Sequence, residues 1–197
     1  QNIPLAHIQG GEVSGNIDEK VRHSISKLAD IHFPATLRAK EWLIRMGEDE
    51  NTVFYTGCPS IDLVNEVLLE PDIDFDLYQK YGGVGDKPDL KNGYYIVMQH
   101  PVTSEQENTS DFIMETLEAI IELRRPVLWF WPNADAGSNL ISKVIRNYRE
   151  HGKLKHVHFI KNMEPSDFLK ILNKSGLVTG SSGAAMREAS CIVISPT

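Results

Sequence analysis

The chain has 197 residues, and its 27 aspartates and glutamates outnumber its 20 lysines and arginines, giving a formal net charge of −7. This acidic balance argues against nucleic acid as a partner, because nucleic-acid binding depends on clustered positive charge. A hydrophobic content of 41% is enough for a sizeable core, and the length suits one domain or parts of two. The sequence has no run of ~18 apolar residues, and residues 1–4 (QNIP) lack the features of a signal peptide. We therefore predict no membrane partner and a cytoplasmic location.

The N-terminal part alternates short apolar runs with segments of helical period. It predicts strands at 5–8, 31–33 and 53–55, and helices at 19–29 and 37–46. Residues 70–92 follow, with two prolines, three glycines and alternating acids, a composition typical of a connector. We place a domain boundary near residue 70.

The C-terminal part repeats the alternation. The predicted strands are 94–98, 127–131, 157–160, 176–179 and 192–194, and the predicted helices are 111–124, 135–150 and 165–175. Asp135 or Ser138 is expected to cap the second of these helices, and Ser166 the third. The apolar runs are unbroken, which is typical of parallel strands buried on both faces.

These elements predict an α/β fold made of two Rossmann-like, doubly wound domains. Residues 1–69 would form the C-terminal part of the first domain, 70–92 a connector, and 93–197 most of the second domain. Because the chain starts with Gln1 and stops just after an apolar run, we expect both domains to be incomplete and the chain to be a fragment.

Polar residues follow the first predicted strand, at the kind of strand end where parallel sheets bind ligands. Glu12 and Asp18 supply carboxylates there. Arg22 falls one helical turn after Asp18, so it is placed to pair with that carboxylate or to clamp an anion. The alternative is structural, with Asp18 capping a helix and forming a surface ion pair.

Two further strand ends carry candidate side chains. His100 follows strand 94–98, and an imidazole at that position suits proton transfer or contact with a phosphate. A single histidine also often has a structural role, so both readings stay open. Asn133 follows strand 127–131, where it would contact a ligand or cap the next helix.

The turn after strand 176–179 is a candidate anion site. Ser181, Ser182 and Gly183 lie between a predicted buried strand and a helix, where backbone N–H groups and the helix dipole attract an anion. Glu188 comes shortly after and can accept hydrogen bonds from ribose hydroxyls. The segment lacks the Gly-Lys-Ser/Thr ending of a Walker loop, and many ordinary helices also start with serine.

Seven motifs, in order and spacing, resemble the UDP-N-acetylglucosamine 2-epimerase family. They are residues 7–15 (HIQGGEVSG), 17–23 (IDEKVRH), 32–36 (HFPAT), 57–60 (GCPS), 99–103 (QHPVT), 131–138 (WPNADAGS) and 181–188 (SSGAAMRE). The first motif is similar to the hydrolysing branch, which serves sialic and legionaminic acid synthesis. The resemblance implies a glycosyltransferase-B type fold with a nucleotide-sugar substrate in the cleft between two domains. It also implies that no metal or other cofactor is required, and that a longer parent protein forms a homodimer.

The reaction that the resemblance implies is elimination followed by hydration. The nucleoside diphosphate leaves C1 as the C2 proton is removed, and water adds to the resulting glycal to give the free 2-epimeric sugar. The implied catalytic residues are Glu12, Asp18, Arg22 and His100. The implied nucleotide-binding residues are Asn133, Asn162, Ser181, Ser182, Gly183 and Glu188, with residues 159–163 lining the base through backbone groups. By itself, we expect this chain to be inactive.

Two positions depart from the family pattern. Gln9 is an amide where relatives often have a carboxylate, so Glu12 or Asp18 would take more of the role of base. Residues 180–183 read GSSG where relatives usually read Gly-Asn-Ser-Ser. Two other functions stay open: a glycosyltransferase of the same fold, and a nucleotide-sugar binding module without turnover. The sequence fixes neither the sugar nor the choice between uracil and guanine.

Overall fold

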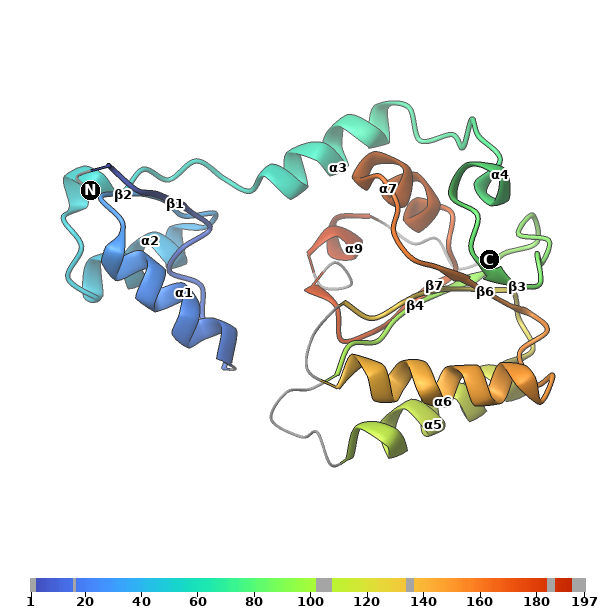
Figure 1. The fold of residues 1–197 in the computed structure, drawn as a ribbon. Coiled ribbons are helices and arrows are strands. Elements are labelled where there is room, and N and C mark those ends of the chain that lie inside the picture. Colours follow the sequence, from blue (N-terminus) through green and yellow to red (C-terminus); the bar gives the residue numbers. More distant parts are fainter. Residues whose placement is uncertain (1–2, 16, 102–107, 134–136, 184–186, 193–197) are drawn as a thin grey trace. The chain divides into compact units, whose positions relative to one another are not determined.

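The computed structural model describes residues 3–15, 17–101, 108–133, 137–183 and 187–192. The chain divides into two compact units, residues 1–62 and residues 63–197 (Figure 1). Both units are α/β, and most of their strand pairs are parallel, as predicted. None of the helices in the described ranges combines the length and the apolar character needed to cross a bilayer.

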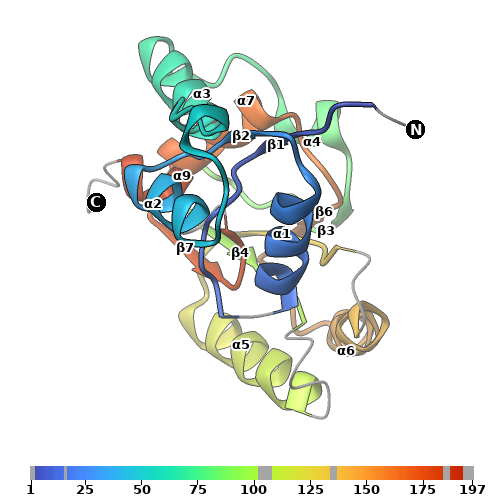
Figure 2. The ribbon, with the colours of Figure 1, turned by 90° about the vertical axis from the view of Figure 1, so that its left-hand side faces the viewer.

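The first unit is built on two short parallel strands, β1 (Ala6–Ile8) and β2 (Ile31–Phe33), joined by helix α1 (Ile17–Leu28) (Figure 2). Helix α2 (Leu37–Arg45) follows. The predicted strand at 53–55 is reduced to a single parallel bridge from Val53 to His32 of β2, with the N–H of Phe54 donating to the carbonyl of His32 at 2.8 Å. A short 3-10 helix, η1 (Glu50–Thr52), comes directly before it, and the next two side chains are exposed.

The second unit contains a five-stranded sheet in the order β3-β6-β5-β4-β7. Four of its strands are parallel, namely β4 (Tyr95–Met98), β5 (Val127–Phe130), β6 (Val157–Ile160) and β7 (Leu177–Gly180). Every residue of β5 and β6 is buried, as their largely apolar runs predict, and the one polar residue among them is His158. Strand β7 is less buried, because among the described strands it pairs with β4 alone. The predicted strand 192–194 falls mostly outside the described residues.

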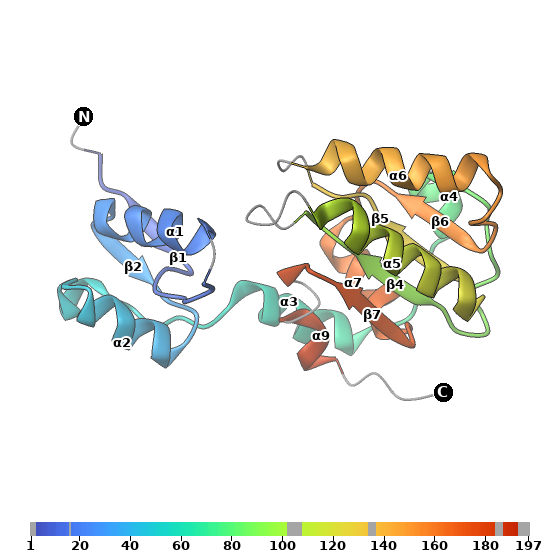
Figure 3. The same ribbon diagram turned by 90° about the horizontal axis from the view of Figure 1, so that it is seen from below.

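Helices cover both faces of this sheet (Figures 1 and 3). Helices α5 (Thr109–Leu123) and α6 (Ser138–Glu150) pack side by side on one face, over a core that contains Trp129 and Phe159. The other face carries α7 (Pro165–Asn173), α9 (Glu188–Cys191), α4 (Leu77–Tyr81) and the C-terminal part of α3 (Pro59–Leu69). The sequence did not predict α3 or α4.

The starts of two helices differ from the prediction. Helix α7 begins at Pro165 with Glu164 as its cap, so the predicted cap Ser166 lies inside the helix. Proline favours the first helical position because its fixed φ suits a helix and the missing N–H would have no partner there. Helix α6 follows Gly137 as its cap and not Ser138; the alternative cap, Asp135, lies outside the described residues.

Residues 70–92, predicted as a connector, pack on the second unit. Leu77 is buried in the core, and strand β3 (Val84–Gly85) pairs antiparallel with β6. The buried ring of His158 faces two carbonyl oxygens of this segment, with Nε2 2.7 Å from that of Gly82 and Nδ1 2.9 Å from that of Asp86. These contacts hold the segment against the edge of the sheet.

Candidate functional site

The order in which strands are added to the second sheet reverses between β4 and β7. From β4 the chain adds β5 and then β6 on one side, and it then returns to place β7 on the other side of β4. Parallel α/β sheets bind ligands at such a switch point, beyond the carboxyl ends of the strands. The loops that leave this edge begin at residues 99, 131, 161 and 181, and they contain most of the predicted site residues.

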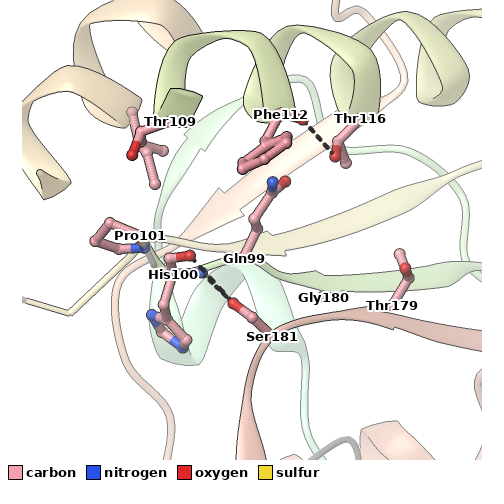
Figure 4. A pocket seen from close by; sticks show the side chains of 10 residues that line it. Gln99, His100, Pro101, Thr109, Phe112, Thr116, Thr179, Gly180 and Ser181 are labelled. Atoms are coloured by element: carbon pink, nitrogen blue, oxygen red, sulfur yellow. Dashed lines mark hydrogen bonds between the residues drawn. The ribbon is translucent and has the colours of Figure 1, made fainter. Parts of the chain in front are cut away.

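Ser181 joins the ends of the two strands at the switch point. Its backbone N–H donates to the carbonyl oxygen of Met98 at 3.0 Å. Its Oγ accepts from the N–H of His100 at 2.9 Å and lies 3.1 Å from the carbonyl oxygen of His100, to which it can donate (Figure 4). The strands approach this closely because residue 180 is glycine: its φ is +133°, and a Cβ there would lie 2.1 Å from the carbonyl oxygen of Met98.

The imidazole of His100 is oriented by the next loop. The backbone N–H of Asn133 lies 3.2 Å from Nδ1 of His100 and donates to it. A ring nitrogen that accepts a hydrogen bond carries no proton, so the proton of the neutral imidazole is on Nε2. The hydroxyl of Ser138 donates to the carbonyl of Asn133. The predicted Asn133 therefore contacts His100 through its backbone N–H.

A cavity of about 230 Å³ opens at the same strand ends. The side chain of Gln99 points towards Phe112 of α5, whereas the ring of His100 points away from it (Figure 4). Oε1 of Gln99 is buried and has no hydrogen-bond partner among the described residues. Gln99 was not among the predicted site residues, although its place directly after a strand was a signal for it. The cavity is lined by Gln99, His100, Pro101, Thr109, Phe112, Thr116, Ile141, Thr179, Gly180 and Ser181.

The remaining predicted nucleotide residues lie at the same edge of the sheet. The N–H of Arg187 donates to the carbonyl of Gly183 at 2.9 Å. Glu188 is the first residue of α9, and its Oε2 is buried with no hydrogen-bond partner among the described residues. Asn162 lies exposed in the loop between β6 and α7.

The three predicted residues of the first unit surround the loop between β1 and α1. Nη1 of Arg22 donates to the carbonyl of Glu12 at 2.9 Å and to Oγ of Ser14 at 3.2 Å. No ion pair joins Asp18 and Arg22 among the described residues. Asp18 lies exposed in the first turn of α1, one residue inside the helix and not at its cap.

Glu19 shapes this loop, and the sequence analysis did not select it. Its Oε2 accepts hydrogen bonds from the backbone N–H groups of Gly15, at 2.5 Å, and Ser14, at 2.8 Å. These two hydrogen bonds, chiefly the one from Gly15, lower the pKa of Glu19. Gln9, with a φ of 62°, donates from its amide to Sγ of Cys58 at 3.2 Å. Across the described parts of both units, no three histidine, cysteine or acidic side chains gather as metal ligands.

Comparison with known proteins identifies the family. The family model described as UDP-N-acetylglucosamine 2-epimerase matches residues 1–195. The chain belongs to this family. It is 35% identical over 189 residues to the Legionella pneumophila UDP-N,N'-diacetylbacillosamine 2-epimerase (hydrolyzing), covering 95% of this chain and 47% of that relative. It is 29% identical over 192 residues to the Campylobacter jejuni GDP/UDP-N,N'-diacetylbacillosamine 2-epimerase (hydrolyzing), and that match covers 95% of this chain and 47% of the relative.

The solved structures agree on the fold. The crystal structure of the Methanocaldococcus jannaschii UDP-GlcNAc 2-epimerase in complex with UDP-GlcNAc and UDP matches with a TM-score of 0.71 and 20% identity. The match covers 96% of this chain and 51% of that chain. The chain thus has the α/β fold of the glycosyltransferase-B type epimerases. It spans about half the length of the curated relatives it matches.

Proposed function

We propose that the complete protein is a hydrolysing nucleotide-sugar 2-epimerase that acts on a UDP-linked 2-acetamido sugar. The observation that carries this proposal is the arrangement of His100, Ser181 and Asn133 at the switch point of the second sheet. A 2,4-diacetamido sugar is the substrate we favour, because the Legionella and Campylobacter relatives are both named for N,N'-diacetylbacillosamine.

The second unit would bind the nucleotide. Nε2 of His100 would donate its proton to the diphosphate, because Nδ1 already accepts from Asn133. Ser182 and Gly183 would offer backbone N–H groups to a phosphate just beyond the end of β7. The buried Oε2 of Glu188 would accept hydrogen bonds from the ribose hydroxyls, which would supply the donors that this oxygen lacks among the described residues. Ser181 supports the site indirectly, by holding the backbone of His100.

The first unit would carry out the chemistry at C2. Glu12 or Asp18 would take the C2 proton as the C1–O bond breaks and its electron pair leaves with the diphosphate, forming the C1=C2 double bond. Water then adds its hydroxyl to C1, and C2 receives a proton on the opposite face. The cationic Arg22 would stabilise the negative charge that develops on the departing diphosphate. The products are the nucleoside diphosphate and the free 2-epimeric sugar.

The deciding experiment follows product release from the complete protein in deuterated water, with no acceptor added. UDP-N,N'-diacetylbacillosamine and UDP-N-acetylglucosamine would be compared as substrates by NMR. Release of UDP together with a free 2-epimeric sugar that carries deuterium at C2 is the expected result. UDP release without deuterium at C2 would point to simple hydrolysis or to a glycosyltransferase without its acceptor. Binding with no product would point to a binding module.

Two substitutions separate binding from chemistry. His100→Ala should weaken UDP binding and reduce turnover, because it removes the donor to the diphosphate. Asp18→Asn should leave UDP binding unchanged and lower kcat by ~100-fold or more, the usual contribution of a general base. Unchanged turnover in both variants would contradict the assignment of these residues. The homodimer, the cytoplasmic location and the domain limits at residues 69 and 92 stay predictions from the sequence.

A further inference from the structure

The loop between β6 and α7 is held at its C-terminal end. It comprises residues 161–164, of which Lys161, Asn162 and Glu164 are exposed while Met163 is buried in the core. It leaves the same edge of the sheet as the loop that carries His100. Exposed loops of this kind need an anchor if their backbone groups are to present a fixed pattern to a ligand.

Tyr81 of α4 supplies an anchor through its hydroxyl. The backbone N–H of Glu164, the cap residue of α7, donates to Oη of Tyr81 at 3.3 Å. The same hydroxyl donates its proton to the carboxylate of Asp167, a 7% exposed residue in the first turn of α7. In a capping box, the side chain of the third helical residue accepts directly from the N–H of the cap residue. Here Asp167 holds that third position, and Tyr81 bridges the two groups.

The surroundings of Tyr81 keep this bridge in place. Nζ of Lys80 lies 2.5 Å from Oδ2 of Asp167, so the charge of the carboxylate is balanced. The ring of Tyr81 packs edge-on against Phe75, with 6.0 Å between the ring centroids. Burial, together with the hydrogen bond to Asp167, raises the pKa of Tyr81, so the hydroxyl keeps the proton that it donates.

We propose that Tyr81 is a positioning residue for recognition of the nucleotide base: it fixes loop 161–164 so that the backbone groups of the loop meet the base. This inference rests on the proposed function, which places the nucleotide at this edge of the sheet. Recognition through backbone groups requires a fixed loop, because a loop that becomes ordered only on binding loses conformational entropy, and this loss lowers the affinity. Through Tyr81 of α4, the segment 70–92 would therefore contribute to recognition of the nucleotide base.

The test compares Tyr81→Phe with Tyr78→Phe in the complete protein. Tyr78 lies on the same helix, but its hydroxyl donates to the carbonyl of Pro88, so it is a matched control. Calorimetry would measure the binding of UDP and of inorganic pyrophosphate, which has no base. We expect Tyr81→Phe to bind UDP about 5- to 10-fold more weakly, the equivalent of one hydrogen bond, and to bind pyrophosphate unchanged. Its KM should rise while its kcat stays the same, and Tyr78→Phe should match the unmodified protein in every measurement.

Hydrogen exchange of the backbone amides of residues 161–164 gives a second readout that needs no nucleotide. Faster exchange in Tyr81→Phe, and not in Tyr78→Phe, is expected. Unchanged exchange would overturn the positioning role. Equal losses of UDP and pyrophosphate affinity would overturn the role in base recognition, because they would show a general loss of structure. If the unmodified protein bound no UDP, the proposed function would fail and the base role with it, while the exchange result would still decide whether Tyr81 holds the loop.

Discussion

Ser181→Ala should weaken both the fold of the second unit and its binding of UDP. The substitution removes the hydroxyl that accepts from the N–H of His100 at 2.9 Å and lies 3.1 Å from its carbonyl oxygen. A typical hydrogen bond contributes about 0.5–1.5 kcal/mol to stability, so two give about 1–3 kcal/mol. Because water reaches these groups, the lower half of that range is expected, about 1–2 kcal/mol.

Urea denaturation of the complete protein would measure this loss. The midpoint should fall in Ser181→Ala while the dependence of the unfolding free energy on urea stays the same. Ser190→Ala is the matched control, since its exposed hydroxyl donates to the carbonyl of Arg187 at 2.8 Å and otherwise lies only 3.9 Å from Sγ of Cys191. This hydroxyl should contribute less than about 0.5 kcal/mol. UDP should bind about 10-fold more weakly to Ser181→Ala, because the backbone that carries the imidazole is no longer fixed. A midpoint and a UDP affinity equal to those of Ser190→Ala would refute this account of the strand junction.

Two further predictions concern backbone geometry and pH. Gly180→Ala would place a Cβ 2.1 Å from the carbonyl oxygen of Met98 at a φ of +133°, so we expect a loss of about 3 kcal/mol or more in urea denaturation and no UDP binding; stability like that of the unmodified protein would contradict the close approach of β4 and β7. Burial, with smaller contributions from His32 and Arg22, lowers the pKa of His7, so its protonation favours the unfolded state. The unfolding free energy should therefore decline as the pH falls from about 6.5, the ordinary value, through the lower pKa of the folded state, and less steeply in His7→Asn; equal slopes between pH 7.5 and 5 would show that another group is responsible.

The central strands of the second sheet could be predicted because the apolar residues that are buried there follow one another in the sequence. Strand β5 is apolar on both faces, β6 is apolar except at His158, and every residue in both strands is buried. The prediction at 53–55 used the same signal, but there the pairing with β2 stops at one bridge, from Val53 to His32, and a hydrogen bond from the N–H of Phe54 to the carbonyl of His32. An apolar run indicates that side chains favour burial, but not over how many residues the backbone pairs with a neighbouring strand.

The contacts of residues 70–92 could not be predicted from composition. Glycines and prolines indicate a connector, yet the segment contributes α4 and β3 to the second unit. Its anchors are partners far away in the sequence, because His158 faces carbonyl oxygens of Gly82 and Asp86, and Tyr81 donates to Asp167. No local pattern contains such pairs.

In the candidate site, the sequence predicted which residues lie there better than it predicted the contacts they make. The position of His100 directly after a strand was enough to select it. The hydroxyl of Ser181 and the backbone N–H of Asn133 contact His100 in the structure, and no local pattern predicted these contacts. The nucleotide-binding role that the family resemblance implies for both residues stays a prediction. Side-chain chemistry can be predicted from residue type, but a backbone hydrogen bond depends on how strand ends are brought together.

The contacts that position the site residues of one unit are separate from those of the other unit. Substitutions can therefore test nucleotide binding and catalysis independently. His100 depends on Ser181, Asn133 and the close approach at Gly180, all within the second unit. The loop that carries Glu12 depends on hydrogen bonds from Arg22 and on those that Glu19 accepts, all within the first unit. Substitutions of the contacts around Glu12, in the first unit, should therefore change kcat with little effect on UDP affinity. Substitutions of the contacts around His100, in the second unit, should change UDP affinity. A variant such as Glu19→Ala that lost UDP affinity without losing turnover would show that the roles of the two units are not divided in this way.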